Sequence, residues 1–164
     1  NIVYVIGKTE GHLDQSIFAR YILLEKKGPP PSINLFNEKN IGETILNLID
    51  KNLIQTCHDV SLGGILTAVS KMCIKGQKGI KIHPFKDLIN KYEYFFGEDQ
   101  GRYIIEIETS NVKKVNDLLE KNSIHFDNLG IIEDKNISFN AEMNLPIEEL
   151  TKTHKYWMMS YMKN

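Results

Sequence analysis

The sequence predicts a single α/β domain with a two-layer architecture, in which helices cover a mixed β-sheet. Its 164 residues suit one compact domain of ordinary size. Hydrophobic residues make up 41% and charged residues 25% of the chain, as in typical globular domains. Short β-branched runs alternate with amphipathic stretches for most of the length, and two short strands follow near the end. This order favours a mixed sheet over a purely parallel one.

Strands are expected where β-branched and aromatic residues cluster or alternate with polar residues. These segments are residues 2–6, 53–58, 79–82, 102–108, 129–132 and 137–139. Residues 133–136 are polar enough for a hairpin turn, so the last two strands are expected to pair. The first strand follows Asn1 directly, which suggests that residues 1–164 are one domain of a longer chain.

Helices are expected where apolar residues recur three or four positions apart. These segments are residues 14–25, 38–51, 65–74 and 111–122, with a helical turn over 85–90 and a final helix or helix pair that Pro146 opens. Ser110 or Asn111 is the expected cap of the helix over 111–122. The consecutive prolines at 29–31 cannot donate backbone hydrogen bonds and predict an extended connector.

Charge and hydropathy exclude several classes of partner. The net charge is −1, so the chain lacks the basic excess that drives binding to nucleic acid or anionic lipid. No apolar run approaches the ~20 residues of a membrane span, and no signal peptide is visible, which predicts a cytoplasmic protein. The two cysteines, Cys57 and Cys73, are expected to be reduced thiols, with Cys57 in the core.

The first candidate site is the turn after the strand that ends at His58. It reads His58-Asp59-Val60-Ser61-Leu62-Gly63-Gly64. Glycines at a strand-to-helix turn let backbone N–H groups and a helix N-terminus approach an anion, and phosphate is the expected ligand. The alternative is structural: Gly63 and Gly64 permit tight packing, while Asp59 or Ser61 caps the helix.

The second candidate site is the loop Gly97-Glu98-Asp99-Gln100-Gly101-Arg102. Adjacent carboxylates can hold Mg²⁺, and the amide and guanidinium can orient a polar ligand. The alternative is a solvated turn in which Arg102 pairs with Glu98 or Asp99. The histidines show no metal-binding spacing, and Cys57 and His58 are strand neighbours that point to opposite faces, so no metal ligand or catalytic residue is assigned.

Several motifs occur in a fixed order along the chain. They are Gly11-His12-Leu13-Asp14-Gln15-Ser16, Gly28-Pro29-Pro30-Pro31, the two candidate loops just described, and His154-Lys155-Tyr156-Trp157 followed by Tyr161-Met162. Together they resemble the C-terminal α/β domain of phosphoribosylformylglycinamidine synthase, a family with an aminoimidazole ribonucleotide synthase-like fold. The resemblance covers nearly the whole chain and implies that it is the last domain of a longer synthase.

The resemblance implies an ATP-dependent carbon–nitrogen ligase of purine biosynthesis. Such an enzyme converts formylglycinamide ribonucleotide and glutamine-derived ammonia to formylglycinamidine ribonucleotide, with ATP and Mg²⁺ as cofactors of the full-length protein. The implied partners are the remaining synthase domains, a glutaminase subunit and a small accessory subunit. Most of the active site then lies in other domains, so the isolated chain is expected to be inactive. The resemblance assigns no cofactor to this chain by itself.

The same resemblance makes His58, Asp59, Ser61, Gly63, Gly64, Glu98, Asp99, Gln100 and Arg102 candidates for phosphate or nucleotide binding. Two positions depart from the family pattern: Leu62 stands where an Asp is expected, and Asp14 stands where a Gly is expected. A lost carboxylate at position 62 weakens a ligand-orienting role for the first turn, and a side chain at position 14 hinders close backbone approach. The corresponding pocket is therefore expected to be degenerate.

Two alternatives remain open at this point. One is a domain of a related ATP-using enzyme, of the aminoimidazole ribonucleotide, selenophosphate, thiamine-phosphate or hydrogenase-maturation type. The other is a non-catalytic interaction module, in which Trp157 and its apolar neighbours dock on other domains or a second copy. The ligase interpretation also requires that the two candidate loops meet at one edge of the sheet and form half of a cleft.

Overall fold

The computed structural model describes residues 1–84 and 89–163, which form a mixed α/β fold. In chain order the elements are β1 (Ile2–Ile6), α1 (Ile17–Tyr21), α2 (Leu35–Asp50), β2 (Thr56–Asp59), α3 (Gly64–Gly76), β3 (Gly79–Ile82), α4 (Lys91–Phe96), β4 (Tyr103–Ile107), a 3₁₀ turn (Thr109–Asn111), α5 (Val112–Lys121), β5 (Phe126–Glu133), β6 (Asn136–Phe139), β7 (Met143–Pro146) and α6 (Ile147–Tyr161). Among the described residues, no helix is long and apolar enough to cross a bilayer.

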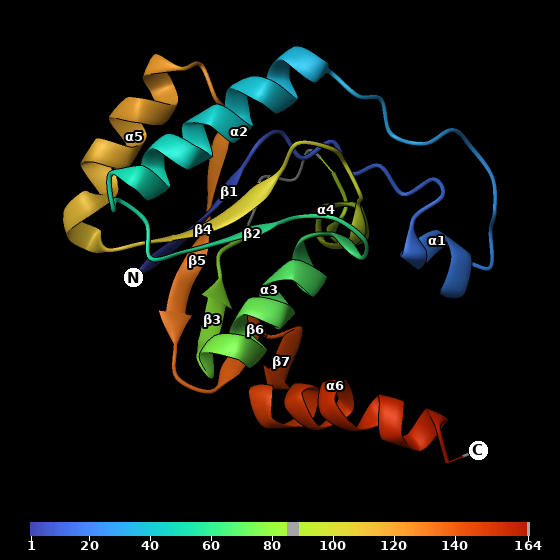
Figure 1. Cartoon of the computed structure of the whole chain (residues 1–164). Coiled ribbons are helices and arrows are strands. Elements are labelled where there is room, and N and C mark those ends of the chain that lie inside the picture. Colours follow the sequence, from blue (N-terminus) through green and yellow to red (C-terminus); the bar gives the residue numbers. More distant parts are fainter. Residues whose placement is uncertain (85–88, 164) are drawn as a thin grey trace.

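The strands form one sheet in the order β2-β4-β1-β5-β3-β6-β7 (Figure 1). Neighbouring strands are antiparallel except β3 and β6, which run parallel. The predicted α/β class and mixed sheet are therefore confirmed. The outer strand β2 pairs with β4 so that Asp59 lies opposite Tyr103. This register brings the end of β2 to the start of β4.

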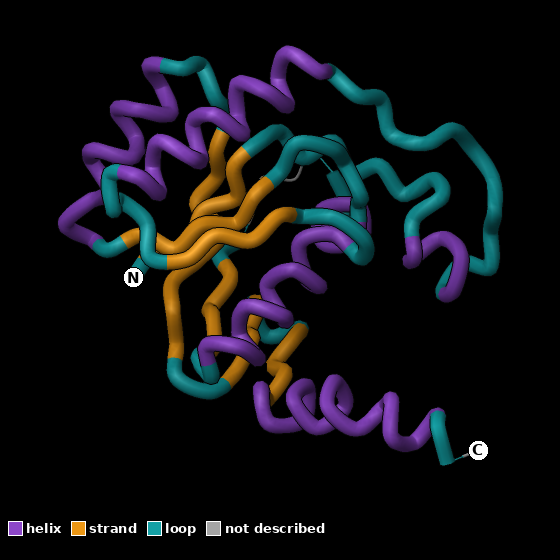
Figure 2. The backbone as a smooth tube through the Cα atoms, viewed as in Figure 1, coloured by secondary structure: helices purple, strands orange, loops and turns teal. Residues whose placement is uncertain are grey.

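Helices cover both faces of the sheet, which adds a layer to the two that the sequence predicted (Figure 2). The alternation along β1 explains this, because successive side chains in a strand point to opposite faces. Val3 and Val5 belong to the apolar core under α3 and α4, whereas Tyr4 and Ile6 belong to the core under α2 and α5. Both faces of the central strands are therefore buried.

The predicted hairpin between the last two strands is wrong. β3 lies between β5 and β6 and pairs with both, and the hairpin at this end of the sheet joins β6 to β7. The chain crosses the end of β3 at Gly79, where a Cβ atom would lie 2.2 Å from the carbonyl oxygen of Asn136. Only glycine permits so close an approach of two backbone segments. The residues of the predicted turn do not reveal this contact, because it depends on a strand elsewhere in the sequence.

Several boundaries also differ from the prediction. The helix over 14–25 shortens to α1, because Tyr21, Ile22 and Leu24 are exposed and no packing supports further turns. The strand over 53–58 shrinks to β2, and α2 begins earlier because the Asn34 side chain caps it. The sequence interpretation missed α4 and β7. Of the helical turn predicted over 85–90, residues 85–88 lie outside the described residues, and Ile89 and Asn90 are not helical.

Two smaller expectations concern single residues. Cys57 is exposed rather than part of the core, whereas Cys73 is buried, and both are free thiols. Burial raises the pKa of the Cys73 thiol to about 11. Asn111 occupies the N-cap position of α5, but its side chain makes no capping hydrogen bond there.

Candidate functional site

The two loops predicted as binding sites meet at one edge of the sheet. The first is the turn from Val60 to Gly64 between β2 and α3, and the second is the loop from Gly97 to Arg102 between α4 and β4. The backbone N–H of Val60 donates to the carbonyl oxygen of Arg102 at 2.9 Å. The convergence that the sequence interpretation required is therefore present.

A single carboxylate oxygen joins these loops to a third segment. Oε1 of Glu98 accepts hydrogen bonds from the backbone N–H of Gly63 at 2.8 Å and of Ile17 at 2.9 Å. Gly63 is the N-cap of α3, so Glu98 supplies the negative charge that favours a helix N-terminus. Neither Asp59 nor Ser61 caps this helix, which corrects the structural alternative suggested by the sequence.

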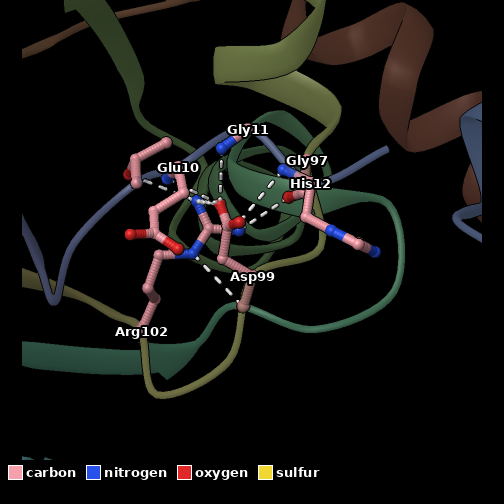
Figure 3. Close-up of polar contacts among 7 residues, drawn as sticks. Glu10, Gly11, His12, Gly97, Asp99 and Arg102 are labelled. Carbon is pink, nitrogen blue, oxygen red and sulfur yellow. Dashed lines mark hydrogen bonds and ion pairs between the residues drawn. The ribbon is translucent and has the colours of Figure 1, made fainter. Parts of the chain in front are cut away.

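Asp99 organises the loop that follows β1 (Figure 3). Its Oδ2 accepts from the backbone N–H groups of Glu10 and Gly11, at 3.2 Å and 3.0 Å, and its Oδ1 accepts from that of His12 at 3.0 Å. A further hydrogen bond joins the same two loops: the backbone N–H of Glu98 donates to the carbonyl oxygen of His12 at 2.8 Å. Asp99 therefore fixes the path of residues 10–12.

Arg102 lies beneath this loop and is almost completely buried, with 2% of its surface exposed against 7% for Asp99. Its Nη1 is 3.4 Å from Oδ2 of Asp99, and its Nη2 donates to the carbonyl oxygen of Gly97 at 2.6 Å. Burial lowers the pKa of Arg102, and the nearby Asp99 carboxylate opposes that shift. The predicted ion pair exists, but it is a buried structural pair rather than part of a solvated turn.

Glycines make this close packing possible. Gly64 has a φ of +68°, and a Cβ atom on it would lie 2.6 Å from the carbonyl oxygen of Phe95. Gly7 has a φ of +92°, and its Cβ would lie 2.4 Å from the carbonyl oxygen of Gly101. Larger residues fit neither the backbone conformation nor the space.

The other predicted residues lie at the surface of this edge. Asp59, Ser61 and Gln100 are exposed, and His58 is partly exposed. Nδ1 of His58 lies 3.5 Å from a carboxylate oxygen of Asp59. These side chains remain accessible, whereas Glu98, Asp99 and Arg102 are engaged with the chain's own backbone.

A polar cavity of about 360 Å³ adjoins the acidic loop. Asp99, Gln100 and Gly101 line one side, and residues of the loop after β1 and of the start of α2 line the others, including His12 and Glu38. Nε2 of His12 lies 3.0 Å from the carbonyl oxygen of Pro29, which ties the proline connector to this cavity. The sequence interpretation did not identify Glu38 or the start of α2 as part of this site.

The described residues do not fit a magnesium site. No group of three or more His, Cys, Asp or Glu side chains among them is arranged to hold a metal ion. The two adjacent acids of the loop already bind the backbone: Oε1 of Glu98 and both carboxylate oxygens of Asp99 accept backbone hydrogen bonds.

Fold and loops together define a mixed α/β domain whose strand-end loops form one side of a polar cavity. The chain belongs to the family described as AIR synthase related protein, C-terminal domain, whose model matches residues 1–140. It is 57% identical over 164 residues to phosphoribosylformylglycinamidine synthase subunit PurL of Pelagibacter ubique, covering 100% of this chain and 22% of that protein. The PurL subunit of Bartonella quintana is 35% identical over 163 residues, with 98% of this chain and 22% of that protein covered.

Solved structures support the fold. The structure of Thermotoga maritima PurL complexed with FGAR superimposes with a TM-score of 0.75 and 20% sequence identity, over 92% of this chain and 27% of that one. The present chain thus spans about a fifth of the curated relatives that it matches. The resemblance inferred from the motifs is confirmed at the level of the family and its fold.

Proposed function

We propose that this chain is the last α/β domain of a PurL-type synthetase subunit. In that role it forms part of an ATP-dependent ligase that converts formylglycinamide ribonucleotide and glutamine-derived ammonia to formylglycinamidine ribonucleotide. The observation that carries the proposal is the 57% identity to Pelagibacter ubique PurL over the whole chain. No residue of this chain is assigned a catalytic role, and the chain by itself is expected to be inactive.

The proposal assigns the predicted site residues to two groups. Glu98, Asp99 and Arg102 form a frame that holds the loops in place, because their charged groups bind backbone atoms and one another. The partly exposed His58 and the exposed Asp59, Ser61 and Gln100 face the rest of the enzyme and complete a cleft with it. The backbone of Gly63 and Gly64 determines how closely a ligand can approach that surface, although the Gly63 N–H already donates to Glu98.

Cofactors, partners and location follow from the same proposal. ATP and Mg²⁺ serve the whole enzyme, with the metal held by residues outside this chain, in accord with the engaged carboxylates of Glu98 and Asp99. The partners are the remaining domains, a glutaminase subunit and a small accessory subunit, and the location is the cytoplasm. A solved structure of PurLQS from Thermotoga maritima supports an assembly of several components in this family.

A chimera tests the proposal. The matching segment of Pelagibacter ubique PurL is replaced by this chain, and ADP release is measured with formylglycinamide ribonucleotide and ammonium as substrates. We expect the chimera to turn over and the isolated chain to release no ADP. A chimera that melts like its parent yet is inactive would refute the proposal, and so would turnover by the isolated chain. The same chain placed in an aminoimidazole ribonucleotide synthase is the matched control and should be inactive.

A second candidate is an interaction module, and one observation favours it. Near the end of α6, Trp157, Met158, Met159 and Tyr161 are each about half exposed or more. Exposed apolar patches of this kind mark contact surfaces. This role is compatible with the first, because a domain of a larger enzyme also needs a surface for its neighbours.

A further inference from the structure

A second cavity lies beside α3, and of its lining residues the proposed function uses His58 alone. It has a volume of about 550 Å³, within the range of small-molecule sites. Its apolar wall comes from the sheet and from the inner face of α3, and includes Val3, Ile104, Val69 and Met72. Thr56 and Cys57 of β2, one of the two edge strands, also line the cavity and are exposed.

This cavity borders the candidate site at His58, but its other lining residues lie away from the two candidate loops. Lys71, Lys75 and Gly76 line it and belong to the second half of the helix, whereas Gly63 and Gly64 stand at its beginning. The polar cavity beside the acidic loop shares no lining residue with it. A ligand bound here therefore does not compete directly with one bound beside Gln100.

The charges that line the cavity favour an anion. Lys71 and Lys75 are exposed and, within the described part of the chain, form no ion pair. Lys78 also lines the cavity but pairs with Asp134 at 3.0 Å. The one carboxylate of the lining, Glu106, accepts hydrogen bonds from Asn1 and Thr56. Two lysines without an ion pair in the described part of the chain thus share the lining of this cavity with its apolar residues.

We propose that this cavity binds a small amphiphilic anion, with an apolar chain or ring against the sheet and one carboxylate at the lysines. The apolar part gains from leaving water, and the long lysine side chains keep their charged ends at the surface above it. A neutral molecule of the same size gains the first contribution only. The site should therefore discriminate between a charged ligand and its uncharged counterpart.

The test uses the purified 164-residue chain and decanoate as the probe, with decanol as its uncharged counterpart. Binding is located by the methyl signals of the five methionines in an NMR spectrum. Met72 lines the cavity, whereas Met158 and Met159 lie on the exposed part of α6 and Met162, also exposed, is its C-cap. We expect decanoate to shift Met72 in a saturable way and decanol to bind at least about tenfold more weakly.

Charge reversal provides a second arm. The variant carrying Lys71→Glu and Lys75→Glu should bind decanoate about tenfold more weakly, because attraction becomes repulsion. The matched control carries Lys113→Glu and Lys114→Glu on α5, exposed lysines that do not line the cavity, and should bind like the parent. Shifts confined to the α6 methionines, equal binding of decanol, or equal loss in both variants would each overturn the proposal.

Discussion

Replacing Asp99 by Asn should destabilise the domain severely, although the change alters a single atom. Both carboxylate oxygens of Asp99 are acceptors: Oδ2 faces the Gly11 N–H and the Arg102 guanidinium, and Oδ1 faces the His12 N–H. An amide has only one oxygen, so either orientation of the substituted side chain sets its NH₂ group against another donor. The change also removes the charge that compensates the buried guanidinium.

The magnitude follows from the burial of the pair. Removing one partner of a buried ion pair costs about 3–5 kcal/mol, because the other charge is left uncompensated. For a chain of this length each kcal/mol lowers Tm by about 2–4 °C, so the expected fall in Tm is about 6–20 °C. Circular dichroism during thermal and urea unfolding measures both the Tm and the free energy of unfolding.

A matched control separates burial from charge. Asp134→Asn breaks the ion pair with Lys78, in which both side chains are exposed, and should leave Tm almost unchanged because solvent screens such a pair. A double variant, Asp99→Asn with Arg102→Met, should recover part of the loss because no buried charge remains. Equal Tm values for Asp99→Asn and Asp134→Asn would refute the reasoning.

Three further predictions concern other parts of the molecule. Burial raises the pKa of Tyr94 to about 12 and of Cys73 to about 11, so their contribution to stability is complete below the pKa that each group has in the unfolded chain and is lost as pH rises through the folded pKa. Tyr94→Phe should therefore flatten the decline in the free energy of unfolding that urea unfolding measures between about pH 10 and 12, and an unchanged profile would contradict this. Gly64→Ala should lower the free energy of unfolding by more than about 1 kcal/mol, because Gly64 has a positive φ and an added Cβ would collide with the Phe95 carbonyl oxygen. Gly42→Ala, with nothing near its Cβ, should instead stabilise α2 by about 0.5–1 kcal/mol, and similar urea midpoints for the two variants would count against the steric argument. Trp157→Ala should leave the free energy of unfolding within about 0.5 kcal/mol of the parent and reduce self-association in sedimentation; an unchanged sedimentation profile would exclude a role for this side chain in association between copies of the chain.

Two strands could be predicted with matching boundaries because their patterns are strong. Ile2–Ile6 is a continuous apolar run that is buried on both faces, and Gly79–Ile82 alternates, with Ile80 and Ile82 buried and Lys81 exposed. α4 was missed because it is short and rich in aromatic residues, although its start carries a readable signal: Asn90 and Glu93 form a capping box. α1 was overextended for the opposite reason, since its apolar spacing says nothing about what the helix packs against.

The position of the candidate site could be predicted from the sequence, but the hydrogen-bond partners within it could not. The flanking strand and the glycines of the first turn marked it, and the pairing of β2 with β4 brought both loops together. The role of Glu98 depends on partners 35 and 81 residues away, at Gly63 and Ile17, and no local pattern contains that information. The same holds for Asp99, whose acceptor role depends on how the loop after β1 folds back.

The central claim is that Glu98 holds the two candidate loops and α1 together as one unit. Amide hydrogen exchange in Glu98→Ala, compared with Glu108→Ala, measures this directly. Glu108 is an exposed glutamate whose carboxylate accepts a hydrogen bond from the side chain of Gln55, at 3.0 Å. We expect exchange at both Gly63 and Ile17 to accelerate about 10–100-fold in Glu98→Ala and to stay unchanged in Glu108→Ala. Acceleration at only one of the two amides, or at neither, would contradict the claim.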